Sequence, residues 1–489
     1  MKKLIYGSKM KEIDSYAINE IGIPSIALME RAAFSVFCEM EKMCSKQENI
    51  LIVCGTGNNG ADGLALARML KLKGYRVDIQ VIGDILKATQ EFKIQKSVTD
   101  KLEVMVAERP VYESYDYIVD ALFGVGLCRE ITGVYKETIE RMNESNAVKI
   151  AIDIPSGLSG DTGAILGAGF VSDITVTFGI LKTGLVISQG PDYAGQVIVA
   201  DIGFPQTGHA DIFAHEEQDL LSIPRRRKNS NKGSYGRLLV IAGSENMAGA
   251  AFLCAKSAYR VGTGLVQILT PKENREILQT LLPEAILKTY DASNPDFEEI
   301  SGYIDRASAI VAGPGLGISE NAMKLIEKVM LAKKKTVIDA DGLNIISQFP
   351  HLTGCYHSDI IITPHIREMS RLTCIEEDKI KNDLISTCRG YCEEHKISCI
   401  LKDSGTVICT GDRIYINLSG NPGMATAGAG DVLAGIAGGL LAMGLGTDIA
   451  SSIGPFIHGL AGDRTVKKTG ESALMASDII DGLKDIIGD

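Results

Sequence analysis

Short apolar runs alternate with longer amphipathic stretches over most of the chain. In the first half, the runs rich in β-branched residues predict strands at 50–55, 77–83, 115–124, 147–157 and 173–179. Stretches with helical spacing, such as 61–74, separate these runs. Buried strands spaced by helices are typical of a largely parallel sheet with helices on both faces, so the pattern predicts a three-layer α/β/α domain. Residues 1–49 precede the first predicted strand and are expected to be helical.

The alternation stops at 205–235 and then resumes. This segment mixes Pro, Gly, His and charges without a sustained period, which predicts a linker, and its run Arg225–Lys228 is expected to be solvated. A second α/β unit follows, and we place the two domains at 1–211 and 220–489. In the second unit a helix is expected over 248–261, another after Asp431 and one at the C-terminus. Its strands are expected at 237–244, 265–271, 308–317, 335–344, 359–365 and 398–410.

Length, composition and charge narrow the class of protein. The chain has 489 residues, of which 45% are apolar and 23% charged, as in soluble proteins of two or three domains. A net charge of −11 and the absence of tryptophan argue against nucleic-acid and anionic membrane partners. The N-terminus lacks the apolar core of a signal peptide, and the longest apolar stretch, 432–446, is too short and glycine-rich to cross a bilayer. We expect a cytoplasmic homo-oligomer that acts on a small-molecule substrate.

Eleven cysteines are scattered along the chain without a C-x-x-C pair. Cys388, Cys392 and Cys399 form the tightest cluster, and the first two could share one helix face. This spacing favours buried free thiols in a reducing compartment over a metal site.

A glycine-rich loop, GTGNNGADG at 55–63, follows the first predicted strand and opens a helix. Its three leading glycines allow close backbone approach, and the helix that follows offers free N–H groups to an anion. Glycine spacing alone is weak evidence. The two asparagines and Asp62 strengthen it, because a simple turn needs no polar cluster.

Two later strands of the first half also end in polar loops. Asp120 is followed by glycines, and the segment 151–163 carries Asp153, Ser156 and Asp161. Because the carboxyl ends of parallel strands meet at one edge of a sheet, these loops are expected to converge with the glycine-rich loop. Each aspartate could instead only cap a turn, but three polar loops together favour a binding site.

These three loops resemble the NAD(P)H-hydrate epimerase domain, the N-terminal half of bifunctional NAD(P)H-hydrate repair enzymes, in the strings GTGNNGADGLALARML, VDALFGVGL and AIDIPSGLSGDTG. The likeness covers 1–211 and implies that the domain binds hydrated nicotinamide nucleotide and interconverts its two epimers at ring carbon six. The potassium ligands it implies are Asn59, Asp120 and Ser156. The substrate ligands it implies are Asn58, Asn59, Gly60, Ala61, Asp62, Gly124, Val125, Gly126, Leu127, Cys128, Arg129, Glu130 and Asp153.

Two positions depart from the usual residues of that family, with Ala61 in place of glycine and Val125 in place of threonine. Neither change removes a charged group, so activity is expected to be retained. Epimerisation of a hemiaminal-like carbon, by ring opening or by loss and return of hydroxide, needs an acid and a base and no redox cofactor. Asp153 is our candidate for this catalytic proton transfer, although its carboxylate could equally hydrogen-bond a ribose.

The second half carries a small-residue string, GAGD at 428–431, at the start of a long apolar helix. Small residues there expose backbone N–H groups toward a transferring phosphoryl group, and Asp431 beside them could take a proton from an attacking hydroxyl. A capping role would explain the aspartate but not the glycines before it. The string resembles the signature of ribokinase-like small-molecule kinases.

Further segments resemble the NAD(P)H-hydrate dehydratase domain of the same enzymes, at 231–244, 312–317, 337–344, 363–372 and 401–408. The likeness implies a ribokinase-like α/β domain after a Rossmann-like one, with ADP or ATP as co-substrate, Mg²⁺, and K⁺ in the first domain. ADP is our choice, because the fused arrangement resembles the bacterial and archaeal ADP-dependent enzymes. The implied dinucleotide ligands are Ala250, Gly317, His365 and Asp431. The implied nucleotide ligands are Lys402, Asp403, Ser404, Gly405, Thr406 and Gly430.

One string departs from the dehydratase pattern. The usual His-Pro-Gly-Glu is His365-Ile366-Arg367-Glu368 here, so the loop gains bulk and a cation between its two retained residues. The departure puts the local backbone and the fit to the substrate in question.

Hydroxide is a poor leaving group and phosphate a good one, which suggests why a kinase-like site could dehydrate. We hypothesise that Asp431 deprotonates a ring hydroxyl of the S hydrate, which takes phosphate from ADP and then expels it, giving NAD(P)H, AMP and phosphate. The epimerase would convert the R form into the form that the dehydratase uses. The alternative is a ribokinase-like small-molecule kinase fused to a non-catalytic nucleotide-binding module, which would release a stable phosphorylated product.

Overall fold

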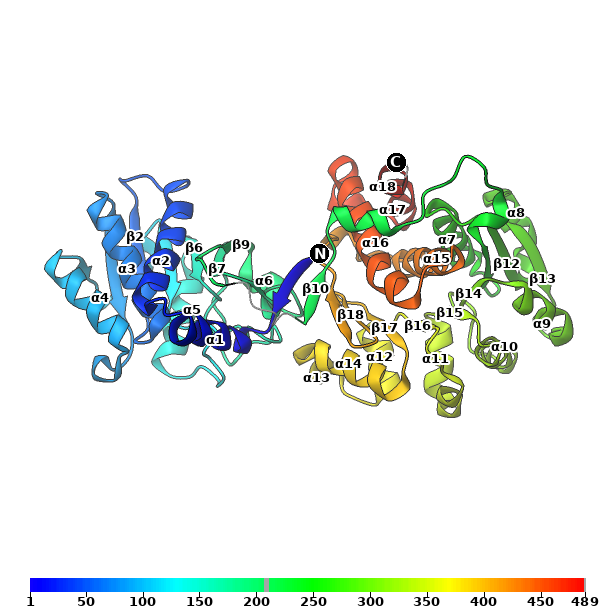
Figure 1. The fold of residues 1–489 in the computed structure, drawn as a ribbon, viewed down its shortest axis with the longest axis horizontal. Coiled ribbons are helices and arrows are strands. Elements are labelled where there is room, and N and C mark those ends of the chain that lie inside the picture. Colours follow the sequence, from blue (N-terminus) through cyan, green and yellow to red (C-terminus); the bar gives the residue numbers. More distant parts are fainter. Residues whose placement is uncertain (206–210, 488–489) are drawn as a thin grey trace. The chain divides into compact units, whose positions relative to one another are not determined.

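A computed structural model describes residues 1–205 and 211–487. The chain divides into two compact units, an N-terminal unit of Lys3–Asp211 and a C-terminal unit of Ile212–Asp489 with Met1–Lys2. Figure 1 colours the first from blue to cyan-green and the second from green to red. Residues 206–210 of the predicted linker and 488–489 of the predicted second domain lie outside the described residues. Both units are mixed α/β with largely parallel sheets, so the predicted fold class is confirmed.

The N-terminal unit is built on a parallel sheet in the order β4-β3-β2-β5-β6-β7-β9. The strands of this sheet are β2 Asn49–Cys54, β3 Arg76–Val81, β4 Met105–Val106, β5 Tyr117–Ala121, β6 Val148–Ile152, β7 Ile174–Phe178 and β9 Gln196–Ala200. The helices are α1 Gly7–Ser15, a π-helix Tyr16–Glu20, α2 Ser25–Glu41, α3 Asn58–Leu72, α4 Gln90–Lys101, α5 Val134–Glu144 and α6 Gly190–Ala194.

Alternate residues along strand β2 are buried against two different helical layers. Ile50, Ile52 and Cys54 pack in one core cluster with residues of α2 and α3. Leu51 and Val53 pack in a second cluster with residues of α5. Because side chains alternate between the faces of a strand, two clusters on one strand mean that both faces of the sheet are covered. The predicted three-layer α/β/α arrangement is therefore confirmed.

The first 49 residues are not helical throughout, contrary to the prediction. Lys2–Ile5 form β1, which pairs in parallel with β8, Leu181–Lys182, through Leu4 and Ile5. A four-residue strand has too short a pattern for a period to be recognised, and its partner lies far along the chain. The helices α1 and α2 follow as expected.

The C-terminal unit carries a larger sheet in the order β13-β12-β11-β14-β15-β16-β17-β18-β19-β10. Its strands are β10 Ile212–Ala214, β11 Arg237–Ile241, β12 Leu265–Pro271, β13 Ile286–Tyr290, β14 Ala309–Ala312, β15 Lys335–Ile338, β16 Ile360–Ile362, β17 Ser398–Leu401, β18 Val407–Thr410 and β19 Arg413–Ile416. Its helices are α7 Ala248–Arg260, α8 Arg275–Leu281, α9 Phe297–Arg306, α10 Glu320–Leu331, α11 Asp341–Gln348, α12 Ile366–Thr373, α13 Glu377–Asn382, α14 Leu384–His395, α15 Ala429–Ala442, α16 Thr447–Thr469, α17 Ala476–Gly482 and α18 Lys484–Ile487.

Two segments of this unit differ from the expectation. The run 398–410 was predicted as one strand, but β17 and β18 pair antiparallel around the turn 402–406. Part of the predicted linker is a strand, because Ile212–Ala214 forms β10 and pairs in parallel with β19. Strands β10 and β18 have at most four residues each, so their formation depends on pairing with a neighbouring strand more than on their own hydrophobic pattern.

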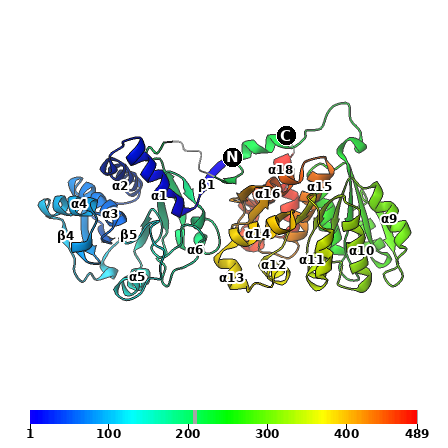
Figure 2. The ribbon, with the colours of Figure 1, turned by 60° about the horizontal axis from the view of Figure 1, so that its bottom comes forward.

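Helix α15 is apolar all round because protein surrounds it. It packs against α7, α16 and the strands β14 and β15, and twelve of its fourteen residues are buried. The helices α9–α12 and α14 lie on the side of the C-terminal sheet opposite to α15 (Figure 1 and Figure 2). Among residues 1–205 and 211–487, no helix combines the length and apolar character that a membrane crossing requires.

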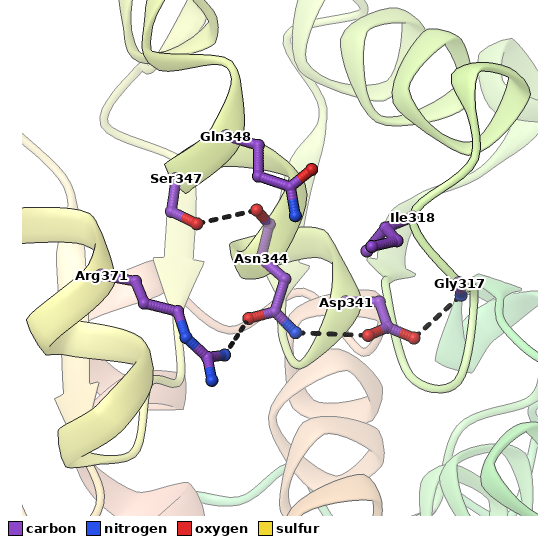
Figure 3. Close-up of a pocket in the computed structure, with 7 residues that line it drawn as sticks. All are labelled: Gly317, Ile318, Asp341, Asn344, Ser347, Gln348 and Arg371. Atoms are coloured by element: carbon purple, nitrogen blue, oxygen red, sulfur yellow. Dashed lines mark hydrogen bonds between the residues drawn. The ribbon is translucent and has the colours of Figure 1, made fainter.

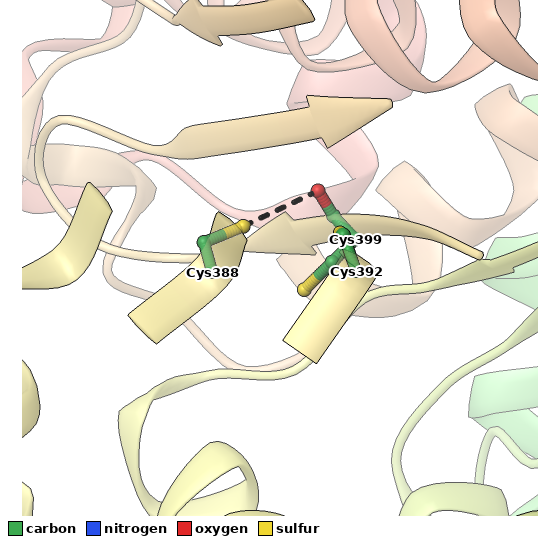
Figure 4. Close-up of side chains that lie close together, drawn as sticks. All are labelled: Cys388, Cys392 and Cys399. Carbon is green, nitrogen blue, oxygen red and sulfur yellow. Dashed lines mark hydrogen bonds between the residues drawn. The ribbon is translucent and has the colours of Figure 1, made fainter. Parts of the chain in front are cut away.

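The cysteine cluster lies between α14 and the sheet (Figure 4). Cys388, Cys392 and Cys399 are buried free thiols, and their sulfur atoms lie within 4.8 Å of one another. The Cys388 thiol donates to the carbonyl oxygen of Cys399 at 3.7 Å, and the Cys392 thiol to that of Cys409 at 3.4 Å. Burial raises the pKa of the Cys388 and Cys399 thiols. Thiols that donate to carbonyl groups agree with packed cysteines.

Candidate active sites

The three polar loops of the N-terminal unit meet around one cavity of about 620 Å³ at the carboxyl ends of β2, β5 and β6. Ala61 is fully buried within α3 and Glu130 is exposed, and neither these two nor Gly60 line the cavity. Asp161 lies elsewhere, where its Oδ1 accepts the N–H of Ser8 at 2.8 Å at the start of α1. The predicted ligands that line the cavity are Asn58, Asn59, Asp62, Gly124, Val125, Gly126, Leu127, Cys128, Arg129 and Asp153.

Two glycines let the loops approach backbone to backbone. A Cβ atom at Gly60 would lie 1.8 Å from the carbonyl oxygen of Gly55, and one at Gly55 would lie 2.2 Å from that of Leu122. No side chain fits at either position. The close approach brings the start of α3, with Asn58 and Asn59, to the cavity, where the first N–H groups of the helix can face an anion.

Asp120 and Ser156 form a buried polar contact at the ends of β5 and β6. The Asp120 carboxylate accepts the N–H and the hydroxyl of Ser156, each at 2.7 Å, and the N–H of Leu122 at 3.0 Å. Burial raises the pKa of Asp120 to about 6, against these hydrogen bonds. Among the described residues, only neutral groups bond this fully buried carboxyl, so the pair suits a cation. Nearby in the loop, the buried Nδ2 of Asn59 has no hydrogen-bond partner.

Asp153 is held by a buried lysine that the sequence patterns did not single out. Lys182 Nζ donates to Asp153 Oδ1 at 2.8 Å, and its side chain is 1% exposed. The Thr177 hydroxyl donates to the same oxygen at 3.2 Å. The backbone of Asp153 has a φ of +69°, a left-handed conformation that aspartate tolerates better than most residues. Strained backbone of this kind often accompanies a functional site.

In the C-terminal unit, Asp431 lies in the first turn of α15, after Gly428 with a φ of +89°. A Cβ at Gly430 would lie 3.4 Å from Lys402 Nζ and 3.8 Å from Asp339 Oδ2, so this backbone faces an ion pair. Lys402 Nζ donates to Asp339 Oδ1 at 2.9 Å. Burial, reinforced by the charge of Asp339, raises the pKa of Asp431 to about 7. A carboxyl with that pKa suits a general base at neutral pH.

Lys402 directly follows the carboxyl end of β17, and its ammonium group lies near several carboxylates. Besides Asp339, its Nζ lies 4.0 Å from Glu368 Oε2. Burial alone would lower the pKa of Lys402, but Asp339 and Glu368 outweigh it and the pKa is raised. In the turn that follows, the Thr406 hydroxyl donates to the Asp403 carbonyl oxygen at 3.0 Å. The predicted nucleotide ligands Lys402–Thr406 thus form one charged strand end and one tight turn.

A second cavity of about 520 Å³ opens beside α11 (Figure 3). Gly317, a predicted dinucleotide ligand, lines it, and its N–H donates to Asp341 Oδ2 at 2.8 Å. Asn344 donates to Asp341 Oδ1 at 3.3 Å and accepts Arg371 Nη1 at 2.6 Å. Ala250 is buried in the first turn of α7.

The chain matches two family models. One, described as NAD(P)H-hydrate dehydratase, matches residues 238–484, and the other, described as YjeF-related protein N-terminus, matches residues 25–184. A bifunctional NAD(P)H-hydrate repair enzyme of Thermofilum pendens is 34% identical over 96% of this chain and 93% of its own length. One of Moorella thermoacetica is 35% identical over 98% of this chain and 96% of its own. This chain belongs to the family of bifunctional NAD(P)H-hydrate repair enzymes.

The C-terminal fold of this repair-enzyme family member also resembles solved structures. A ribokinase-like superfamily protein from Enterococcus faecalis V583 is 24% identical, with a TM-score of 0.51, and the match covers 58% of this chain and 98% of that chain. The predicted ribokinase-like fold of the second half is therefore confirmed.

The string that departs from the dehydratase pattern forms a well-capped helix start in this family member. His365 Nδ1 accepts the N–H groups of Arg367 and Glu368 at 3.1 and 3.3 Å, and the His365 N–H donates to Glu368 Oε2 at 2.8 Å. Arg367 is exposed, and its Nε lies 3.7 Å from Glu377 Oε2. The added cation therefore pairs with α13, and the reciprocal cap between His365 and Glu368 is intact.

Four candidate functional residues of the two sites could not be identified from sequence motifs. Asp14 and Lys182 line the first cavity but stand outside the glycine loops. Asp339 was part of a recognised string without being assigned a role. His458 of α16 lies beside the Ala429 backbone, where burial lowers its pKa to about 4. A lone charged residue in an ordinary helix or strand carries no spacing signal, so only the fold could bring these groups to the sites.

Proposed function

We propose that this chain repairs hydrated NADH and NADPH, with an epimerase domain in 1–211 and an ADP-dependent dehydratase domain in 220–489. The family to which the chain belongs supports both activities. The observation that carries the proposal is the position of Asp431, in the first turn of α15 beside the ion pair of Lys402 and Asp339.

In the dehydratase domain, Asp431 takes the proton of the ring hydroxyl of the S hydrate as that oxygen attacks the terminal phosphorus of ADP. The first N–H groups of α15 stabilise the charge on the transferring group, and Lys402 adds a positive charge beside them. Phosphate then leaves ring carbon six and takes up a proton that ring carbon five loses, which restores the ring double bond, so the products are NAD(P)H, AMP and phosphate. The dinucleotide ligands in this proposal are Ala250, Gly317, His365 and Asp431, and the nucleotide ligands are Lys402, Asp403, Ser404, Gly405, Thr406 and Gly430.

In the epimerase domain, the substrate is held by the residues of 58–62 and 124–130, and Asp153 transfers a proton at the hemiaminal group. The buried carboxyl of Asp120, which only neutral groups contact among the described residues, fits a monovalent cation. K⁺ would be held there by the oxygens of Asp120, Ser156 and Asn59 and would supply positive charge beneath the loop.

Mg²⁺ fits the dehydratase in a different way. The carboxylates near Gly430 already face Lys402, so they are poor candidates for a dedicated cage. Mg²⁺ usually keeps several waters and binds through substrate phosphates, so it would arrive with the nucleotide. We further propose that the protein is a cytoplasmic homo-oligomer without nucleic-acid or membrane partners.

The decisive assay mixes hydrated NADH with the full-length protein and ADP, ATP or neither, and follows the return of the reduced-nicotinamide absorbance. Recovery is expected with ADP and not without nucleotide. Asp431→Asn should abolish this recovery and leave epimer exchange intact. Recovery in the Asn variant would reject the role of Asp431, and a stable phosphorylated product in place of free phosphate would favour a small-molecule kinase.

A further inference from the structure

A carboxyl group from the first helix reaches the epimerase cavity. Lys11, Asp14 and Ile18 line the cavity and are spaced three and four residues apart, so they lie on one face of α1 and the π-helix that continues it. Glu12 points elsewhere, exposed and paired with Lys9 at 2.7 Å. The helix therefore presents exactly one carboxyl, that of Asp14, to the cavity among its described residues.

The charges of this cavity are unbalanced. Four carboxyls line it, those of Asp14, Asp62, Glu91 and Asp153, against the three cations Lys11, Arg129 and Lys182, and the most buried cation, Lys182, is fully engaged. Lys182 Nζ donates to Asp153 Oδ1 at 2.8 Å, to the Thr177 hydroxyl at 2.9 Å and to the Phe178 carbonyl oxygen at 2.6 Å. An ammonium group has three donors, so Lys182 has none left for another carboxylate.

Asp14 and Asp153 have different surroundings, because the Lys182 ammonium group is bonded to Asp153. Burial, together with the charge of Asp153 and against that of Lys182, raises the pKa of Asp14 to about 6. Asp153 is held in the ion pair with Lys182. Burial raises the pKa of Asp62 well above its usual value. Asp62 belongs to the segment 58–62 that holds the substrate in the proposed function, which leaves Asp14 as the carboxyl beside Asp153 for proton transfer.

We propose that Asp14 is the second proton-transferring residue of the epimerase and works with Asp153 across the same cavity. This inference rests on the proposed function of the N-terminal domain. It assigns the acid that the reaction needs beside the base.

The two carboxyls account for a closed proton cycle by ring opening. Asp153 takes the proton of the hydroxyl on ring carbon six, the oxygen forms a carbonyl, and the bond from that carbon to the ring nitrogen breaks. Asp14 gives its proton to the departing nitrogen. After rotation about the bond between ring carbons five and six, the nitrogen attacks the other face of the carbonyl and returns its proton to Asp14. Asp153 returns the other proton to oxygen, so no proton or electron is gained or lost.

The test uses the full-length protein without nucleotide and a single purified epimer of hydrated NADH, with the formation of the other epimer followed by chromatography. Asp14→Asn keeps the size of the side chain and removes the transferable proton. It is expected to lower kcat about 100-fold or more after subtraction of the protein-free rate, with little change in KM. Glu12→Gln, on the exposed side of the same helix, is the matched control and should behave as the wild type.

Asp14→Glu separates proton transfer from shape, because it keeps a carboxyl on a longer side chain, and it should retain more activity than the Asn variant. A thermal unfolding curve of each variant checks the fold. An Asn variant within about threefold of the wild-type kcat would overturn the role of Asp14 while leaving the proposed function standing. Equal losses in the Asn and Glu variants would also overturn it, and an inactive wild type would reject the epimerase function itself.

Discussion

At the scale of single residues, both candidate sites depend on carboxyl groups whose pKa is raised by burial and by a neighbouring carboxylate, against the effect of one nearby lysine. Asp431 and Asp14 lie near lysines that are already paired with other carboxylates, Asp339 and Asp153. Each site thus contains one ion-paired carboxylate and one carboxyl that titrates near neutral pH. This division of roles is what proton transfer at neutral pH requires.

The pH dependence of dehydration should report Asp431. Its pKa is raised to about 7, and only the ionised form can accept a proton from the ring hydroxyl. The kcat/KM of nucleotide-dependent repair is therefore expected to rise about tenfold per pH unit below that value and to level off above it. A profile measured on the S epimer from acidic to alkaline pH checks this. A kcat/KM that stays constant at acidic pH would mean that Asp431 does not act as the base.

The same pKa makes Asp431 costly for the folded state. Because folding raises the pKa of Asp431, the folded state binds this proton more tightly than the unfolded state does. The stability that proton binding gives to the folded state is complete below the unfolded pKa of 3.8 and is lost as the pH rises through about 7. The Asn side chain of Asp431→Asn cannot ionise, so at pH 8 the free energy of unfolding of this variant should exceed that of the wild type by about 1–3 kcal/mol. The variant should therefore unfold at a higher temperature than the wild type at that pH. The difference should vanish near pH 4 in paired thermal melts. An Asn variant less stable at pH 8 would contradict the sign.

At the scale of elements, the start of α3 depends on backbone contact. Gly60→Ala places a Cβ 1.8 Å from the Gly55 carbonyl oxygen, so the loop must move and epimerisation should be lost, with about 2 kcal/mol or more of destabilisation. Gly57→Ala is the matched control, because nothing lies within 4 Å of its Cβ and its φ is −94°. Epimer exchange and urea unfolding compare the two variants. Similar behaviour of both would show that the loop is not held by this contact.

Most elements of this chain could be predicted because their own patterns were long enough. The helices α7 and α15 and the central parallel strands each carry a sustained apolar period or a run of β-branched residues. The strands that were not predicted are β1, β4, β8, β9, β10, β13 and β19. Most of them have two to four residues and depend on partners elsewhere in the chain, and β9 and β13, with five residues each, lie at the ends of their sheets. The same limit applies to the sites. Glycine loops carry a local signal, whereas Asp14, Lys182 and Asp339 become recognisable only when the fold brings them to a site.

At the scale of the whole molecule, the two sites lie in separate compact units. In the proposed function both sites act on the same hydrated nucleotides. Hydration of NADH yields both epimers, and the proposed dehydratase uses one. Each unit has its own sheet order and its own buried clusters, so damage confined to one loop should leave the other activity unchanged. That independence can be tested with variants already defined, without cutting the chain.

Gly60→Ala, with an intact dehydratase, should restore absorbance from an epimer mixture only until the S form is exhausted, and then proceed at the slow spontaneous rate. Asp431→Asn, with an intact epimerase, should restore none. Mixing the two variants should recover the complete signal, because the S form made from the R form by the Asp431→Asn protein reaches the Gly60→Ala protein by diffusion. The full time course, with wild type and Gly57→Ala as references, measures this. If the mixture stalls where Gly60→Ala alone stalls, the epimers do not exchange between proteins and the substrate must stay within one molecule.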